Sequence, residues 1–249
     1  MVDKIDSEFV ELQSNGESLH VEALGAKITL NLNHIPILGS YPRGDGKQGI
    51  THPCTPIFGP DRNNLYGLKQ HGMMRTEHCD IKRVADNILV SHIITDPGYP
   101  SGISVKQIMG VERGSFSLVM VHTNLGSQEA AVNSGEHCYF DAPRGYAGTT
   151  INGRDITVLI EKNNDGIPIA LEETNRIQIP GKPEIELKQN GFNFAMLWVG
   201  RNPETKKLDT DYICIEPVEG DPTGDFFGSY ASMILPGQSR SAMFSLRAL

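Results

Sequence analysis

The sequence is a succession of short segments in which apolar and polar residues alternate, each ended by glycine or proline. The chain has 249 residues, of which 26 are glycine and 15 are proline, and these recur at short intervals instead of collecting in one linker. Residues 27–33 and 116–122 show the period of two that is typical of half-buried strands. No window keeps apolar residues at helical spacing for three turns, so a parallel βαβ fold has little support. We expect an antiparallel all-β fold, with one domain over residues 1–249.

Turn residues mark where these strands should reverse. Asn-Gly and Asp-Gly pairs supply the positive φ angles of tight hairpin turns, and they occur at residues 15–16, 165–166 and 190–191. We therefore predict three hairpins. The densest loop signal covers residues 40–64, which are rich in glycine, proline and aspartate. Because a loop of this length in a compact domain is more often functional than idle, we expect it to take part in a site.

Charge and cysteine content narrow the class of partner. With 22 Lys+Arg against 30 Asp+Glu, the formal net charge is −8 and no basic cluster is present, which disfavours binding to nucleic acid. No apolar run approaches a membrane span, and the N-terminus does not look like a signal peptide. The four widely spaced cysteines contain no CxxC pair. We expect a cytoplasmic protein with reduced thiols and no membrane partner.

The first segment with candidate chemistry places a histidine beside a glycine. His71 is followed by Gly72, and Arg75 lies four positions after His71. Glycine allows another part of the backbone to approach closely, and arginine supplies a fixed cation. The arrangement predicts an imidazole held next to a positive charge. The alternative interpretation is a surface loop with a solvated arginine.

The second segment, residues 135–141, is predicted to be a strand with one polar face. Alternation puts His137, Tyr139 and Asp141 on one face. Cys138 and Phe140 then point to the other. Histidine is the side chain best able to exchange a proton near neutral pH. The face is therefore a candidate for acid/base chemistry, unless it is merely a solvated strand face.

The third segment, residues 211–220, offers a carboxylate. We expect Ile213 and Ile215 to enter the core, with Tyr212, Cys214 and Glu216 on the opposite face. The strand should end at Glu216, before a proline. Partial desolvation between Tyr and Cys would move the pKa of Glu216 towards neutral and make it a usable base. The alternative is an ordinary glutamate at a sheet edge.

Taken in order, several short motifs resemble those of the aldose 1-epimerase (galactose mutarotase-like) superfamily. They are residues 56–60 (PIFGP), 70–75 (QHGMMR), 137–140 (HCYF) and 216–217 (EP), with a closing strand after residues 235–239 (LPGQS). The similarity covers about residues 19 to 249, and only the ordered set is specific. The resemblance implies an antiparallel β-supersandwich with a sugar site on its concave face.

The resemblance also implies roles for four residues. His137 matches the general acid of the family, Glu216 its general base, and His71 and Arg75 its sugar-positioning pair. Interconversion of α and β anomers needs a proton taken from the C1 hydroxyl and one delivered to the ring oxygen. Reclosure uses the same two groups in exchanged roles. The implied activity is that of an aldose 1-epimerase, which requires no metal and no cofactor.

Tyr139 and Asn175 are further expected to bind substrate. Hexose-phosphate mutarotases of the superfamily tend to carry an Asp-Arg pair before a strand, where this chain has Asn175 and Arg176. The amide can still hydrogen-bond a hydroxyl. Those enzymes also tend to carry Arg-Gly-Gly ahead of the Phe-Gly motif, where residues 47–49 read KQG. The resemblance therefore implies a sugar or a sugar phosphate as the ligand, with a glucose-6-phosphate 1-epimerase as an alternative.

Three other classes remain open. A non-catalytic carbohydrate-binding or regulatory protein of the same fold would keep Arg75 and aromatic side chains but would not need Glu216. A glycosidase would need two carboxylates, for which Asp141 and Glu216 are candidates. A cupin-like metal enzyme has less support because no His-x-His pair occurs. We expect a monomer or homodimer.

Overall fold

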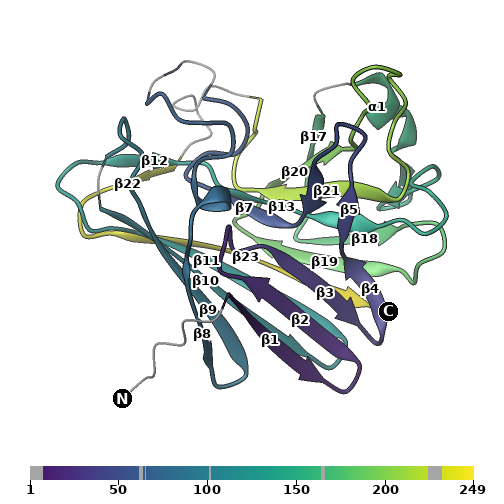
Figure 1. The fold of residues 1–249 in the computed structure, drawn as a ribbon, viewed down its shortest axis with the longest axis horizontal. Helices are drawn as coiled ribbons and strands as arrows, with labels where there is room; N and C mark the ends of the chain where they lie inside the picture. The colour runs from purple at the N-terminus through teal and green to yellow at the C-terminus, as the bar shows by residue number, and fades with distance from the viewer. Residues whose placement is uncertain (1–7, 62–63, 65, 101, 164–165, 224–231) are drawn as a thin grey trace.

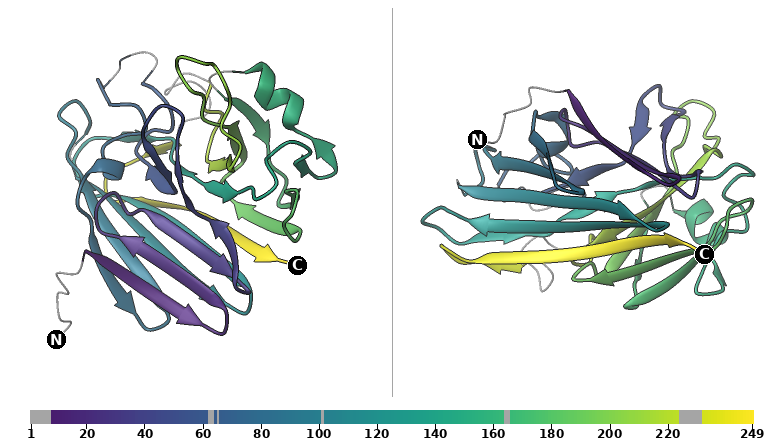
Figure 2. Two further views of the ribbon diagram at one scale, coloured as in Figure 1. Left: turned by 45° about the vertical axis from the view of Figure 1, so that its right-hand side comes forward. Right: turned by 90° about the horizontal axis from the view of Figure 1, so that it is seen from below.

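Most of the chain forms two large antiparallel β-sheets that lie against each other as layers (Figures 1 and 2). The computed structural model describes residues 8–61, 64, 66–100, 102–163, 166–223 and 232–249. Within these ranges one sheet has ten strands and the other has nine. The expected antiparallel all-β fold is confirmed, while the expectation of one domain over residues 1–249 stays a prediction.

The first sheet contains two of the three segments singled out by their chemistry, residues 135–141 and most of residues 211–220. Its path runs β1-β2-β3-β4-β14-β21-β13-β7, and β20 pairs with β21 while β17 pairs with β20. The strands are β1 (Phe9–Ser14), β2 (Glu17–Glu22), β3 (Ile28–Leu32), β4 (Ile35–Leu38), β7 (His52–Cys54), β13 (Gly135–His137), β14 (Tyr139–Asp141), β17 (Ile167–Ala170), β20 (Phe194–Trp198) and β21 (Tyr212–Val218).

The second sheet runs β16-β15-β18-β19-β23-β11-β10-β9-β8. Its strands are β8 (Asp80–Val84), β9 (Asn87–Ile94), β10 (Ile103–Glu112), β11 (Ser115–Asn124), β15 (Thr150–Ile151), β16 (Arg154–Asp155), β18 (Thr174–Gln178), β19 (Ile185–Asn190) and β23 (Ser239–Ala248). Two small ribbons pair β5 (Ser40–Pro42) with β6 (Gln48–Ile50), and β12 (Ala130–Val132) with β22 (Ser232–Ile234). The described helices are α1 (Thr157–Lys162) and a 3-10 turn (Met74–Thr76), and neither has the length or apolarity of a membrane span.

The core lies between the two layers because each sheet turns one apolar face inward. On β3 the residues at alternate positions, from Ile28 to Leu32, are fully buried. On β11, in the opposite sheet, the fully buried residues at alternate positions are Phe116, Leu118 and Met120. Burying one such side chain stabilises the fold by about 1.5–3 kcal/mol. The period of two in both segments is therefore confirmed as the pattern of half-buried strands.

The three predicted hairpins have different outcomes. Asn15 and Gly16, with φ of 39° and 98°, join β1 to β2 as predicted. The prediction at Asn190 and Gly191 is wrong, because β19 belongs to the second sheet and β20 to the first, so this turn is a crossover. Asp165 lies outside the described residues, and the element before it is α1 instead of a strand. A turn with positive φ angles can lead either into the neighbouring strand of the same sheet or across to the other sheet. Turn residues alone therefore do not specify a hairpin.

The predicted strand over residues 135–141 is divided in two. β13 and β14 are separated at Cys138, whose N–H donates to the carbonyl of Glu136. Both pieces pair with β21 in one common register, Tyr139 opposite Cys214 and Gly135 opposite Val218. The prediction that this partner strand ends at Glu216 is wrong, since β21 continues through Pro217 to Val218. A proline removes one N–H donor, but its flanking residues continue the pairing.

A buried polar network ties β21 to the second sheet behind the candidate site. The Ser134 hydroxyl lies 3.1 Å from Nε2 of His122 and donates to Thr55 Oγ1 over 2.7 Å. Nδ1 of the same His122 lies 4.0 Å from Glu219, and the Arg240 Nε lies 3.7 Å from the other carboxylate oxygen of Glu219. Burial raises the pKa of Glu219 from 4.5 to about 7, and Arg240 opposes this only in part.

We expect Glu219→Gln to remove a pH dependence of stability. A carboxyl whose pKa is higher in the folded state binds a proton that the unfolded chain has lost, so wild-type stability should fall as pH rises from about 4.5 to 7. The pKa shift of Glu219 corresponds to a change of about 3 kcal/mol in the free energy of unfolding. The charged or titratable groups around Glu219 are His122, Arg240 and Tyr99. Urea unfolding should show that the free energy of unfolding of the variant rises relative to that of wild type at pH 8 but not at pH 4.5. An equal difference at both pH values would contradict this assignment.

Candidate functional site

Strand register places the predicted acid and base opposite each other. The register that pairs Tyr139 with Cys214 and Gly135 with Val218 sets His137 across from Glu216. On the outer side of β13, His137 pairs with His52 of β7. Three neighbouring strands, β7, β13 and β21, thus present one row of side chains, and such direct cross-strand neighbours lie in contact.

His137 and Glu216 form a buried pair. Nδ1 of His137 lies 3.5 Å from Oε2 of Glu216, and the side chains are 9% and 2% exposed. Burial raises the pKa of Glu216 well above its usual value, opposed by Arg43. Burial and the nearby His52, His71, Arg43 and Arg75 lower the pKa of His137 well below its usual value. The pair therefore favours a neutral imidazole beside a carboxyl that keeps its proton.

Aromatic rings hold the His137 imidazole in place. The ring stacks on Tyr139 at a centroid distance of 4.8 Å and on His52 at 5.0 Å. Trp198 meets it edge-on at 5.7 Å. Cys138 and Phe140 enter the core between the sheets instead. The predicted division of this segment into two faces is confirmed, and so is that of β21, where Ile213 and Ile215 enter the same core.

The His71 loop closes one side of the site. His71 has a positive φ of 66°, and the Gly59 N–H donates to its Nδ1 over 3.1 Å. The neutral ring therefore carries its hydrogen on Nε2, which lies 3.3 Å from the side-chain amide of Gln70, and that amide can accept the hydrogen only through its oxygen. Burial and Arg75 lower the pKa of His71 to about 3, so the ring is neutral. As predicted, Gly72 permits a close approach, because a Cβ built there would overlap the carbonyl oxygen of Thr55.

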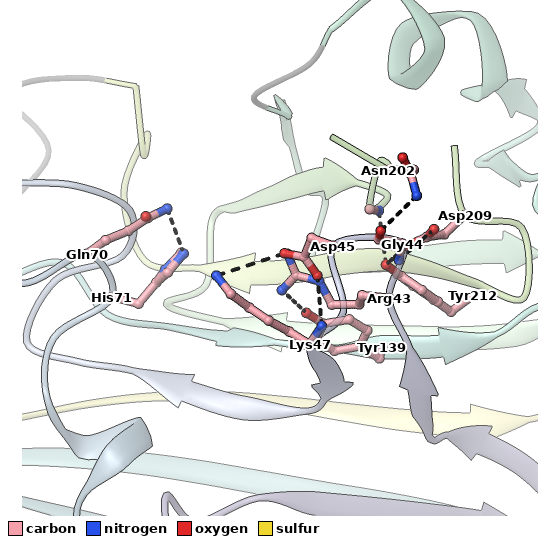
Figure 3. Close-up of polar contacts among 11 residues, drawn as sticks. Arg43, Gly44, Asp45, Lys47, Gln70, His71, Tyr139, Asn202, Asp209 and Tyr212 are labelled. Atoms are coloured by element: carbon pink, nitrogen blue, oxygen red, sulfur yellow. Dashed lines mark hydrogen bonds and ion pairs between the residues drawn. The ribbon is translucent and has the colours of Figure 1, made fainter. Parts of the chain in front are cut away.

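Three cationic side chains, Arg43, Lys47 and Arg75, lie around the site. The Arg43 guanidinium lies 4.8 Å from the Trp198 ring, and its Nη1 donates to the Tyr139 hydroxyl over 3.5 Å. Asp45 forms ion pairs with Arg43 and Lys47, at 2.8 Å and 3.9 Å respectively. Figure 3 shows the Asp45 carboxylate between these two side chains. Arg75, on the 3-10 turn, makes no hydrogen bond or ion pair with another described residue. Its charge is therefore free to meet a ligand.

These groups line one pocket of about 430 Å³. That volume lies within the range of small-molecule sites. The lining residues are Arg43, Lys47, His52, Phe58, Gly59, Pro60, Gln70, His71, Arg75, His137, Tyr139, Met196, Trp198, Glu216 and Pro222.

The pocket brings together five of the six predicted site residues, namely His71, Arg75, His137, Tyr139 and Glu216. Asn175 is not among them. It lies on β18 of the second sheet, is 1% exposed, and exchanges hydrogen bonds with the backbone of Glu172 while accepting one from Asn152. The Asn175 amide stabilises a turn through these hydrogen bonds, and its position does not support the expectation that it binds substrate.

Asp141 also lies apart from Glu216. Its carboxylate accepts from the Tyr41 hydroxyl over 2.9 Å and pairs with Lys182, and it does not line the pocket. The carboxylate pair considered for a glycosidase is therefore not assembled.

Sequence reasoning did not assign Arg43, His52 or Trp198 to the site. The only signal for the first two was their position in the glycine-rich segment 40–64, which was expected to be functional. Their roles depend on pairing with β13 and on contact with β20, which no local pattern reveals.

Comparisons with known proteins identify the fold. No family model matches the sequence, and no curated protein matches it. Among solved structures, the Slr1438 protein of Synechocystis sp. PCC 6803 is similar at a TM-score of 0.78 and 18% identity, covering 99% of this chain and 98% of that one. A galactose mutarotase related enzyme from Lactobacillus acidophilus has a TM-score of 0.76 and 14% identity, with 97% of both chains covered. A galactose mutarotase-like protein from Lactobacillus casei has a TM-score of 0.77 and 14% identity, with 97% and 100% covered. The chain thus has the galactose mutarotase-like fold, in agreement with the superfamily that its ordered motifs resemble.

Proposed function

We propose that this protein is an aldose 1-epimerase that interconverts the α and β anomers of an aldohexose. The observation that carries the proposal is the buried pair of His137 and Glu216, 3.5 Å apart at the wall of a pocket of monosaccharide size. Ring opening needs one proton acceptor at the C1 hydroxyl and one proton donor at the ring oxygen. The pair offers one group of each kind.

The protonation state of the pair suits this chemistry. The pair shares one titratable proton. The proton can lie on Glu216, which leaves both groups neutral, or on the imidazole of His137, which leaves both groups charged. In the charged form, Glu216 accepts the C1 hydroxyl proton while His137 protonates the ring oxygen, and the sugar opens to the aldehyde. Rotation about C1–C2 and reversal of both transfers close the ring on the other face. The enzyme returns to its starting state without a metal or cofactor.

The surrounding residues supply binding and orientation. His71 and Arg75 line the pocket with hydrogen-bond donors that can bind sugar oxygens, and they can stabilise negative charge that develops at the acetal. Trp198 and Tyr139 offer apolar surface for the C–H groups of a hexose. This division between two proton-transfer groups and several binding groups matches what the motif resemblance implies.

Anomer exchange measured by NMR or polarimetry tests the proposal. Glucose, galactose and glucose 6-phosphate should be compared, each against buffer alone. We expect acceleration for at least one of them. Binding without acceleration for every sugar would instead favour a non-catalytic carbohydrate-binding protein of the same fold.

A specific observation favours a phosphorylated hexose as a second candidate substrate. Arg43, Lys47 and Arg75 all line the pocket, and Arg43 and Arg75 lower the pKa of His137. A bound phosphate would offset these positive charges and make the protonated imidazole easier to form. A glucose-6-phosphate 1-epimerase would therefore show a higher kcat/KM for glucose 6-phosphate than for glucose.

We expect Arg75→Ala to raise KM more than it lowers kcat. The guanidinium lines the pocket but does not contact the His137–Glu216 pair through any hydrogen bond or ion pair in the described residues, so its loss should weaken binding by about tenfold or more. Steady-state kinetics with the preferred sugar check this. Lys69→Ala, which removes an exposed cation of the same loop, is the control. An unchanged KM for every active sugar would contradict a role for Arg75 in binding.

A further inference from the structure

One nitrogen, one sulfur and one oxygen atom gather at the edge of the pocket. A ring nitrogen of His137, Sγ of Cys214 and a carboxylate oxygen of Glu216 all lie within 4.8 Å of one another, and all three residues are buried. Nδ1 is the ring nitrogen that lies 3.5 Å from Glu216. The register explains the cluster. Cys214 and Glu216 alternate on one face of β21, and His137 lies directly across from Glu216 and diagonally across from Cys214.

The donor set and spacing suit a zinc ion. Imidazole nitrogen, thiolate sulfur and carboxylate oxygen are the three protein ligands that Zn²⁺ prefers, at bond lengths of about 2.0–2.3 Å. Tetrahedral geometry at those lengths sets ligand atoms about 3.3–3.6 Å apart. The 3.5 Å between His137 and Glu216 already fits. The sulfur needs a shift of about 1 Å at most to complete the set.

Two of these atoms lack a competing partner. Among the described residues, Nδ1 of His137 is buried and has no hydrogen-bond partner. Cys214 is a free thiol with no exposed surface, and no described side chain or carbonyl hydrogen-bonds its sulfur. Buried polar atoms are nearly always satisfied, so an unpaired imidazole nitrogen aimed at a thiol and a carboxyl indicates a ligand site.

We propose that His137, Cys214 and Glu216 form a Zn²⁺ site whose fourth position opens to the pocket. The neutral imidazole binds through the Nδ1 lone pair. The S–H bond of Cys214 and the O–H bond of the Glu216 carboxyl break as the S–Zn and O–Zn bonds form, and both protons are released to solvent. Thiolate and carboxylate together then balance the charge of the ion. Bound zinc occupies both members of the acid/base pair, so the loaded protein should not catalyse anomer exchange. The loss of anomer exchange rests on the proposed function, whereas the zinc site itself does not.

Cobalt is the probe for the site because Co²⁺ replaces Zn²⁺ and absorbs light. Untagged wild-type protein should bind one Co²⁺ with a thiolate-to-metal charge-transfer band, and Zn²⁺ should displace it at one equivalent. We expect Cys214→Ser to lose that band and to bind Zn²⁺ at least 10- to 100-fold more weakly. The matched control is Cys79→Ser, which removes another buried free thiol at the start of β8, outside the cluster. It should behave as wild type.

Absence of the charge-transfer band in wild type, or its equal loss in both serine variants, would overturn the proposal. If Cys214→Ser does not fold, X-ray absorption of the wild-type zinc complex decides instead. One sulfur at about 2.3 Å with nitrogen and oxygen at about 2.0–2.2 Å is expected, whereas nitrogen and oxygen ligands alone would overturn it. Anomer exchange by the metal-free protein is assayed separately, so a failure of the proposed function is distinguishable from a failure of the zinc site.

Discussion

Glu216→Gln should lower kcat for anomer exchange by about 10²–10⁴ while leaving sugar binding almost intact. The amide keeps the shape of the carboxyl but cannot accept the C1 hydroxyl proton. The loss should appear in kcat, because the proton transfer is made only in the transition state. NMR exchange spectroscopy gives the rate, and isothermal titration calorimetry gives the affinity for the same sugar.

Glu136→Gln is the matched control for this variant. Glu136 is adjacent to His137 in the chain and fully buried, but its carboxyl points between the sheets and accepts from the Gln107 amide over 2.9 Å. Burial raises the pKa of Glu136 well above its usual value, which favours its neutral form, and glutamine is a neutral group of the same shape. This control should retain full activity. An equal loss in both variants, or unchanged exchange in Glu216→Gln, would rule out Glu216 as the base.

The largest effect on stability is expected from Gly72→Ala, which should cost about 3 kcal/mol or more. Gly72 has a positive φ of 68°, and an added Cβ would overlap the backbone carbonyl of Thr55, which cannot rotate away. Left-handed strain and steric overlap both destabilise the folded state. The same contact holds the His71 loop against the strand that carries His52, so the site should be disturbed with it.

Gly46→Ala separates the cost of the positive φ angle from the cost of the steric overlap. Gly46 has a comparable φ of 79°, but nothing lies within 4 Å of an added Cβ, so this variant should cost only about 1 kcal/mol. Urea unfolding of both variants measures the difference. Equal costs would mean that the backbone near Thr55 moves aside, and that close approach at Gly72 is not required for the fold.

The sequence was most informative where structure depends on neighbours in the chain. The period of two in β3 and β11 predicted which side chains enter the core, since alternation of side chains is a property of the strand itself. The same reasoning assigned His137 and Tyr139 to one face and Ile213 and Ile215 to the core. Turn residues were less reliable. Asn190 and Gly191 turn the chain as expected but lead into the other sheet.

Local pattern therefore determined the all-β class, the inward faces of strands and the close approach at Gly72, and ordered motifs indicated the acid/base pair. Only the tertiary structure decided that His137 lies across from Glu216, with Cys214 diagonal to it, and that Arg43 reaches Trp198. It also placed Asn175 on the second sheet, outside the lining of the pocket. The physical reason is that strand pairing joins residues far apart in the chain, and its register depends on packing of whole sheets instead of on any single segment.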